Sequence, residues 1–263
     1  MLTIKKHFNL FLIIFLCSLF FTGCSNKGSE ATIIVAAAAD LKYAFTEIGQ
    51  KFTEKYNIPV QFNFGSTGQL AQQIANGAPA DIFSAADVAS VERLAAQGVI
   101  DKQSISQYAR GRIVLLSGKA AATPLNTLQD LLREDIKKIA IANPEHAPYG
   151  LAAKEALHSA GLWDQLQDKI VYGQNIRDTM TLVESGNAEA GIIALSIVQA
   201  GELPYTLIDD KLHKPIIQAM GIVQNSKNKT AAQKFAKFVQ SQEGRAILKK
   251  YGFILPGEEN EQQ

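Results

Sequence analysis

Two absences mark this sequence and exclude whole classes of protein: it has few cysteines and no excess of either charge. Only two of its 263 residues are cysteines, Cys17 and Cys24. Cys17 lies in an apolar N-terminal run that we expect to be removed, so the remaining chain would have one cysteine and no internal disulfide. Removing this run also removes Lys5 and Lys6, which leaves the basic residues nearly equal in number to the 25 acidic ones. Such a balance argues against binding to nucleic acid, which selects basic surfaces.

Common catalytic motifs are also missing. The sequence contains no HExxH, GxSxG or CxxC motif. Of the three histidines beyond the N-terminal run, His158 and His213 have no spaced partners that would suggest a zinc site. His146 could act as a base, but we favour a histidine that is hydrogen-bonded to backbone at the start of a helix. We therefore expect no enzymatic activity, no cofactor and no directly coordinated metal.

The N-terminal run has the organisation of an export signal. A basic start is followed by the apolar segment "FNLFLIIFLCSLFF", which is too short to span a bilayer comfortably, and then by "TGC". The residues from Phe21 to Cys24 resemble a bacterial lipobox, in which the cysteine becomes lipid-modified. An ordinary cleaved signal is the alternative. We predict a signal peptide over 1–23, a tether over 24–30 and a location in the periplasm or at the cell surface, anchored through a lipidated Cys24.

Beyond the tether, β-rich and helical patterns alternate, which predicts an α/β fold with mainly parallel sheets flanked by helices. The spacing favours two lobes, 31–110 plus 220–263 and 111–219, with a ligand in the cleft between them. The expected strands are 32–37, 60–64, 81–85, 108–116, 136–142, 169–172, 190–194 and 215–223. The expected helices are 41–56, 69–76, 88–97, 125–132, 151–160, 176–185, 231–240 and 243–251.

Four junctions between a strand and a helix place small residues or exposed amides where a ligand is expected in such folds. They are 36–42, 64–70, 143–152 and 173–179. Unpaired N–H groups and a partial positive charge at helix N-termini can hold an anion without lysine or arginine. For Ser66 and Thr67 in "FGSTGQL", simple helix capping is the alternative. A turn that merely begins a helix is the alternative for Tyr149, and a core position is the alternative for Ile176.

Three sequence blocks carry a resemblance to a known family. They are "FGSTGQLAQQIANGAPADIFSAAD" (64–87), "NPEHAPYGLAAKEAL" (143–157) and "GRAILKKYGF" (244–253). The chain resembles the periplasmic molybdate-binding proteins of ABC importers from about Thr32 to Phe253. The resemblance implies a two-lobed periplasmic-binding-protein fold of type II that closes on molybdate or tungstate. It also implies a membrane permease as partner, and we expect the protein to be a monomer.

The resemblance also implies which residues bind the oxyanion. The hydroxyl ligand of the family corresponds to Thr67, with Ser66 beside it, and backbone amides correspond to Tyr149 and Ile176. The first junction departs from the family pattern, because Ala39 and Asp40 stand where a serine or another neutral donor is common. The chain also has Ala194 where some members have a tyrosine.

Asp40 is the most consequential departure. A carboxylate about 4 Å from a unit negative charge costs roughly 4 kcal/mol at an effective dielectric constant near 20, and a dianion increases this cost. Three arrangements would avoid the repulsion: the carboxylate caps its own helix, it is protonated, or the ligand is not a simple dianion. We favour capping, because Asp is a leading N-cap residue and "DLKYAF" begins a helix.

Other solutes remain alternatives to molybdate. Sulfate and phosphate are also oxyanions, and sulfate-binding proteins use neutral donors as well. A carboxylate ligand usually meets an arginine fork, for which Arg177 is the candidate; a solvent-facing role is the simpler interpretation of this residue. A tethered sensor that binds the same solute would have a similar sequence.

Overall fold

The computed structural model describes residues 32–198 and 203–258. The predicted signal peptide, the tether and Cys24 therefore lie outside the described residues. Within the described ranges, no helix is both long and apolar enough to cross a membrane.

The first sheet has five strands in the order β2-β1-β3-β10-β4. Strands β1, β2 and β3 are parallel, and β10 pairs antiparallel with both β3 and β4, so β10 alone runs against the others. The strands span Ile33–Ala38 (β1), Val60–Gly65 (β2), Ile82–Ala85 (β3), Ser106–Gly111 (β4) and Ile216–Ile222 (β10). The mainly parallel sheet expected from the sequence is present.

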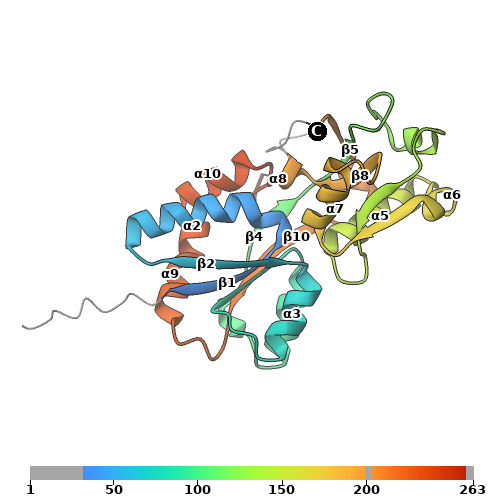
Figure 1. Ribbon diagram of the computed structural model, residues 1–263. Helices are drawn as coiled ribbons and strands as arrows, with labels where there is room; N and C mark the ends of the chain where they lie inside the picture. Colours follow the sequence, from blue (N-terminus) through green and yellow to red (C-terminus); the bar gives the residue numbers. More distant parts are fainter. Residues whose placement is uncertain (1–31, 199–202, 259–263) are drawn as a thin grey trace, which may run out of the picture. The chain divides into compact units, whose positions relative to one another are not determined.

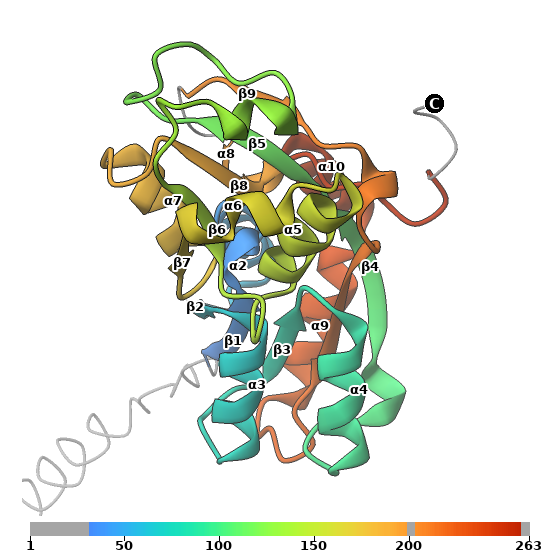
Figure 2. The ribbon, with the colours of Figure 1, turned by 90° about the vertical axis from the view of Figure 1, so that its right-hand side faces the viewer.

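Alternate side chains of this sheet pack into two different clusters, one on each face. Val35 packs with one cluster and its neighbour Ala36 with the other, as the two-residue period of a strand requires. Figure 1 shows α2 and α10 on one side of β1 and β2, and α3 on the other. Helices α3 and α4 lie side by side (Figure 2). The helices span Lys42–Tyr56 (α2), Thr67–Ala75 (α3), Val88–Ala96 (α4), Lys229–Val239 (α9) and Gln242–Lys250 (α10).

The second sheet repeats this plan with the order β7-β6-β8-β5-β9, and here β5 alone runs against the others. Helices α5 and α7 pack against its central strands. The strands span Ile113–Ser117 (β5), Ile139–Ala142 (β6), Ile170–Gly173 (β7), Ala190–Ala194 (β8) and Tyr205–Leu207 (β9), and the helices span Pro148–Ser159 (α5), Trp163–Leu166 (α6), Ile176–Glu184 (α7) and Leu195–Val198 (α8). Short 3-10 turns span Ala39–Leu41 (η2), Lys102–Ser104 (η3), Leu128–Leu132 (η4), Gln167–Lys169 (η5) and Asp210–Leu212 (η6).

The strand predicted over 108–116 is wrong, because the chain leaves the first sheet in its middle. β4 ends at Gly111 and β5 begins at Ile113 in the second sheet. Arg110 and Arg112 beside this crossing approach the same carboxylate, that of Asp210, at 3.3 and 3.8 Å. The chain returns to the first sheet with β10, so the lobe boundary expected at 219/220 falls inside that strand.

Two further elements differ from the prediction. The helix expected over 125–132 is only the 3-10 turn η4, which a capping box of Thr127 and Asp130 begins. The strand expected from 136 begins at Ile139, because the N–H groups of Lys137 and Lys138 donate to the carboxylate of Glu189 instead of to a neighbouring strand. The short elements α6, α8 and β9 were not predicted.

Candidate functional site

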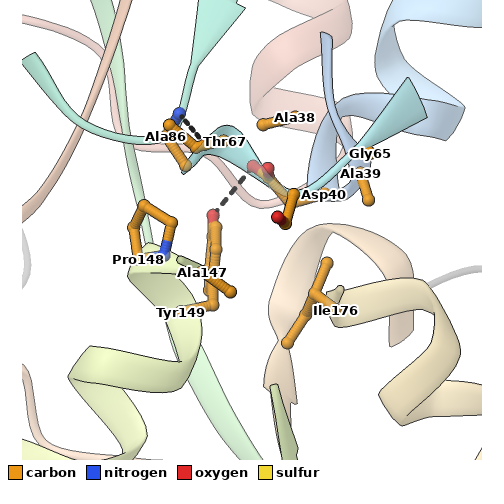
Figure 3. A pocket seen from close by; sticks show the side chains of 11 residues that line it. Ala38, Ala39, Asp40, Gly65, Thr67, Ala86, Ala147, Pro148, Tyr149 and Ile176 are labelled. Atoms are coloured by element: carbon orange, nitrogen blue, oxygen red, sulfur yellow. Dashed lines mark hydrogen bonds between the residues drawn. The ribbon is translucent and has the colours of Figure 1, made fainter. Parts of the chain in front are cut away.

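A small cavity lies where the predicted junctions meet. Residues of both lobes line it (Figure 3). All six residues predicted from the sequence are among the lining residues, which are Ala38, Ala39, Asp40, Gly65, Ser66, Thr67, Ala86, Ala147, Pro148, Tyr149 and Ile176. Their role as ligands remains a prediction. No lysine or arginine is among these lining residues.

Three helices begin at the cavity wall and leave backbone donors unpaired. Thr67 and Ile176 are the first residues of α3 and α7, and Tyr149 is the second residue of α5. At these positions an N–H group has no carbonyl partner inside its own helix. Among the hydrogen bonds of the described residues, none uses the N–H of Thr67, Tyr149 or Ile176. These three amides are available to an anion from both lobes.

Local sequence explains why these amides stay unpaired. In α7 the side chain of Asn175 accepts from the N–H groups of Arg177 and Asp178, which leaves the preceding amide without a partner. In α5 the first position is Pro148, which has no N–H and is favoured there. In α5 and α7, the unpaired N–H nearest the helix start therefore belongs to a cavity-lining residue, Tyr149 and Ile176 respectively.

The two hydroxyls of "FGSTGQL" have different roles. Ser66 is the N-cap of α3 and accepts from the N–H of Gln69 at 3.4 Å, so the capping interpretation holds for this residue. Thr67 does not cap the helix. Its Oγ1 accepts from the N–H of Ala86 at 3.0 Å, which leaves the hydroxyl proton available to a ligand.

We expect Thr67→Val to weaken oxyanion binding roughly 10- to 100-fold, because one donor to a charged group contributes about 1.5–3 kcal/mol. Valine keeps the shape of threonine and replaces the hydroxyl with a methyl group, which also removes the acceptor of the Ala86 N–H. Isothermal titration calorimetry measures the loss, and Thr67→Ser, which retains the hydroxyl, is the matched control. Equal affinity in the wild type and Thr67→Val would remove Thr67 from the predicted ligands.

Asp40 does not cap its helix, so the arrangement favoured from the sequence is wrong. The N-cap of η2 is Ala38, and η2 has no side-chain cap. The Asp40 side chain is buried, and its Oδ2 accepts from Tyr149 Oη at 3.0 Å and from Gln218 Nε2 at 2.9 Å. Figure 3 shows Tyr149 pointing at this carboxyl group. Tertiary contacts have replaced the local capping bond.

The surroundings of Asp40 favour its neutral form. Burial raises the pKa of the Asp40 carboxyl to about 7, although hydrogen bonds from Tyr149, from its own N–H and from Gln218 act in the opposite direction. Since Oδ2 already accepts two hydrogen bonds, Oδ1 is the oxygen left to carry the proton. A protonated Asp40 would be a neutral donor at the junction where the family resemblance implies one, and the repulsion of an anion would disappear.

His146 and Arg177 both contact the opposite lobe. The Nδ1 of His146 lies 2.9 Å from Ser66 Oγ, so the partner of its ring is a side chain of the other lobe and not the backbone expected from the sequence. The backbone oxygen of His146 also accepts from the N–H of Gly68 at 2.9 Å. Arg177 donates to the hydroxyl of Tyr43 at 2.5 Å and lies over its ring, and it does not line the cavity. Neither the carboxylate fork nor the solvent-facing role describes Arg177. In the described part of the chain, no group of three or more His, Cys, Asp or Glu residues is placed to hold a metal ion.

Sequence reasoning missed two residues that hold the site together. Gln218, which bonds to Asp40 and to Tyr149, is fully buried in β10. Ser196 in α8 donates to the backbone oxygen of Asp40 at 2.9 Å. The signal available for Gln218 was a single polar residue in the apolar segment "IIQAMGI". No comparable signal marked Ser196.

Comparison with known proteins identifies the family. The model of the bacterial extracellular solute-binding proteins matches residues 33–254. The chain belongs to this family. It is 32% identical to the putative ABC transporter substrate-binding lipoprotein YvgL of Bacillus subtilis, over 94% of this chain and 98% of that protein. It is also 32% identical to the molybdate-binding protein ModA of Rhodobacter capsulatus, over 88% of this chain and 92% of that protein.

A solved structure supports the same relationship. The periplasmic molybdate-binding protein of Azotobacter vinelandii superimposes with a TM-score of 0.81 at 31% identity, covering 85% of this chain and 99% of that one. The two-lobed fold and the resemblance to molybdate-binding proteins predicted from the sequence blocks are confirmed. Membership of this family makes the chain an extracytoplasmic solute-binding protein.

Proposed function

We propose that this protein binds molybdate or tungstate and delivers it to the permease of an ABC importer. The observation that carries the proposal is the cavity itself, in which unpaired amides of three helices and the hydroxyl of Thr67 converge from both lobes. Relatives named as molybdate-binding proteins support the choice of anion. In this proposal the chain acts as a carrier and not as an enzyme.

Neutral donors suit this task. Helix N-termini stabilise an anion without a formal positive charge, so the position and number of N–H and O–H groups determine which anion fits. Molybdate and tungstate are larger than sulfate but have the same tetrahedral shape. A cavity whose donors are spaced for the larger anions would therefore select molybdate and tungstate over sulfate by size.

The proposal includes the route of delivery. A monomer held at the membrane surface through a lipidated Cys24 would present its loaded lobes to the permease. The sequence around Cys24 and the lipoprotein name of the Bacillus subtilis relative support this anchor. The metal travels as an oxyanion, and no protein atom is expected to coordinate it directly.

Thermal unfolding with molybdate, tungstate, sulfate and phosphate titrated separately tests the proposed function. A ligand at 100 times its dissociation constant stabilises the folded state by about 2.7 kcal/mol, which corresponds to about 5–10 °C for a chain of this size. We expect such a shift with molybdate and tungstate at the lowest concentrations. A shift with sulfate or phosphate alone would assign another solute, and no shift with any of the four would contradict the proposal.

A further inference from the structure

Three buried polar side chains join the two lobes behind the cavity. Tyr149 Oη donates to Asp40 Oδ2 at 3.0 Å, and Gln218 Nε2 lies 2.9 Å from the same oxygen and 3.2 Å from Tyr149 Oη. Asp40 belongs to the first lobe, Tyr149 is the second residue of α5 in the second lobe, and Gln218 lies on β10. At most 2% of the surface of each residue is exposed. We call these three residues the interlobe clamp.

The clamp lies at the crossing between the lobes. The pairing of β10 with β4 shifts its register between Gln218 and Ala219, so the ladder is irregular at the clamp. Gly111 ends β4 at the crossing, and a Cβ atom there would overlap Tyr149 Oη. The phenol of Tyr149 is therefore seated against both strands at the place where a hinge would bend.

Burial of this cluster has an energetic cost that packing alone does not explain. Gln218 Oε1 has no hydrogen-bond partner among the described residues, and the carboxyl group of Asp40 is removed from water. A buried polar atom without a partner calls for a specific explanation, and a connected network of hydrogen bonds favours one geometry of its members. An apolar side chain of similar size would fill the position of Gln218 without leaving a polar atom unpaired.

Tyr149 connects this cluster to the anion site. Its backbone N–H is unpaired at the cavity wall, whereas its phenol is held by Asp40 and Gln218 on the other side. Asp40 itself lines the cavity, and Ser196 of the second lobe holds its backbone oxygen. A single 3.0 Å hydrogen bond therefore links wall residues of opposite lobes.

We propose that the interlobe clamp sets the spacing between the anion-binding groups of the two lobes and thereby determines which size of tetrahedral anion the closed cavity accepts. This inference rests on the proposed function, since it assigns the selectivity of that same site. Gln218 and the phenol of Tyr149 are positioning groups in this account, and Asp40, which also lines the cavity, accepts a hydrogen bond from each of them. Two further side-chain contacts join the lobes at cavity-lining residues, from His146 to Ser66 and from Ser196 to the backbone oxygen of Asp40, and neither involves Tyr149.

The test is the ratio of molybdate to sulfate affinity in clamp variants, measured by calorimetry. Tyr149→Phe removes the phenolic hydroxyl and keeps the ring and the backbone amide, and Gln218→Met removes both side-chain donors at similar length. We expect each variant to bring the affinity ratio at least tenfold closer to one. Tyr108→Phe is the matched control, because Tyr108 is an equally buried tyrosine whose hydroxyl bonds to no clamp residue. This control should keep the wild-type ratio.

A conservative substitution of Asp40 distinguishes an effect on the position of the anion-binding groups from an effect on overall stability. Asp40→Asn retains an oxygen that accepts from Tyr149 and Gln218, whereas Asp40→Ala retains none. The ratio should remain nearer to the wild-type value in Asp40→Asn than in Asp40→Ala. A variant that is merely less stable would bind both anions less tightly by the same factor, so an unchanged ratio in Tyr149→Phe and Gln218→Met would overturn the inference.

The outcomes also separate this inference from the proposed function. A wild-type protein that prefers sulfate would contradict molybdate as the ligand, yet the clamp would still be judged by whether Tyr149→Phe reduces that preference. If the wild type prefers molybdate and both clamp variants keep its affinity ratio, the proposed function is supported and the role of the clamp in selectivity is contradicted. If the wild type binds neither anion, both the proposed function and the role of the clamp are contradicted.

Discussion

Asp40→Asn is expected to bind molybdate about tenfold more tightly than the wild type at pH 8 and about a hundredfold more tightly at pH 9, with no difference at pH 6. The reason is the ionisation of Asp40, whose pKa burial raises to about 7. Above this pH the wild type must take up a proton before the anion can bind without repulsion, and each further pH unit costs a factor of ten. Asparagine remains neutral throughout. Calorimetry from pH 6 to pH 9 measures both curves.

The stability of the ligand-free protein should depend on pH through the same carboxyl group, that of Asp40. The folded-state pKa of about 7 lies above the model value of 3.8, so the folded protein binds this proton more tightly than the unfolded chain does. The contribution of Asp40 to the free energy of unfolding is present in full below pH 3.8 and is lost as the pH rises to 7. This loss amounts to about 4 kcal/mol and is absent in Asp40→Asn. Urea unfolding of both proteins at pH 4 and pH 8 measures it.

Asp81→Asn is the control for both measurements. Asp81 is another buried carboxylate, but its partners include the N–H of Ile34 and the hydroxyl of Ser226, and it lies outside the cavity. Its substitution should leave the pH dependence of molybdate affinity as in the wild type. Parallel affinity curves for the wild type and Asp40→Asn between pH 6 and pH 9 would show that the Asp40 carboxylate does not face the anion.

Gly150→Ala should lower the free energy of unfolding by about 3 kcal/mol and molybdate affinity at least a hundredfold. A Cβ atom at Gly150 would overlap the backbone carbonyl of Ala142 at the end of β6, so α5 or the strand must move. Backbone shifts forced by overpacking typically cost about 1–3 kcal/mol, occasionally more. The affinity falls as well, because the amide of Tyr149 moves with the first turn of α5. Chemical denaturation and calorimetry measure the two effects.

Gly161→Ala, just beyond the other end of α5, provides the comparison. Gly161 has φ of +69°, and a Cβ atom there would meet nothing within 4 Å. We expect a loss of about 1–2 kcal/mol from the left-handed conformation and unchanged affinity. If Gly150→Ala binds molybdate as tightly as Gly161→Ala does, the close contact of α5 with β6 is not what positions Tyr149.

Much of the fold could be predicted because its signals are local. Strand β8 agrees with the prediction residue for residue, and most predicted helices agree within one to three residues at each end. Glycines that follow helices, such as Gly77, Gly98 and Gly186, mark these ends, because their backbones adopt positive φ. One error occurred where a distant group competed with the local pattern, as the carboxylate of Glu189 does before β6.

The same distinction applies to the site. The positions of the four junctions followed from the alternation of strands and helices, since parallel strands bring their carboxyl ends to one edge. The state of Asp40 did not follow, because a helix-start aspartate predicts a cap when only its neighbours are considered. Its actual partners lie 109 and 178 residues away along the chain.

Residue order alone was therefore sufficient for the α/β plan, the family and the six residues that meet at the cavity. Each of these depends on short-range periodicity or on contiguous motifs. Only the tertiary structure decided the ionisation of Asp40, the contact of His146 with Ser66 and the hydrogen bonds of Gln218. These properties depend on burial and on partners that become neighbours only when the two sheets come together.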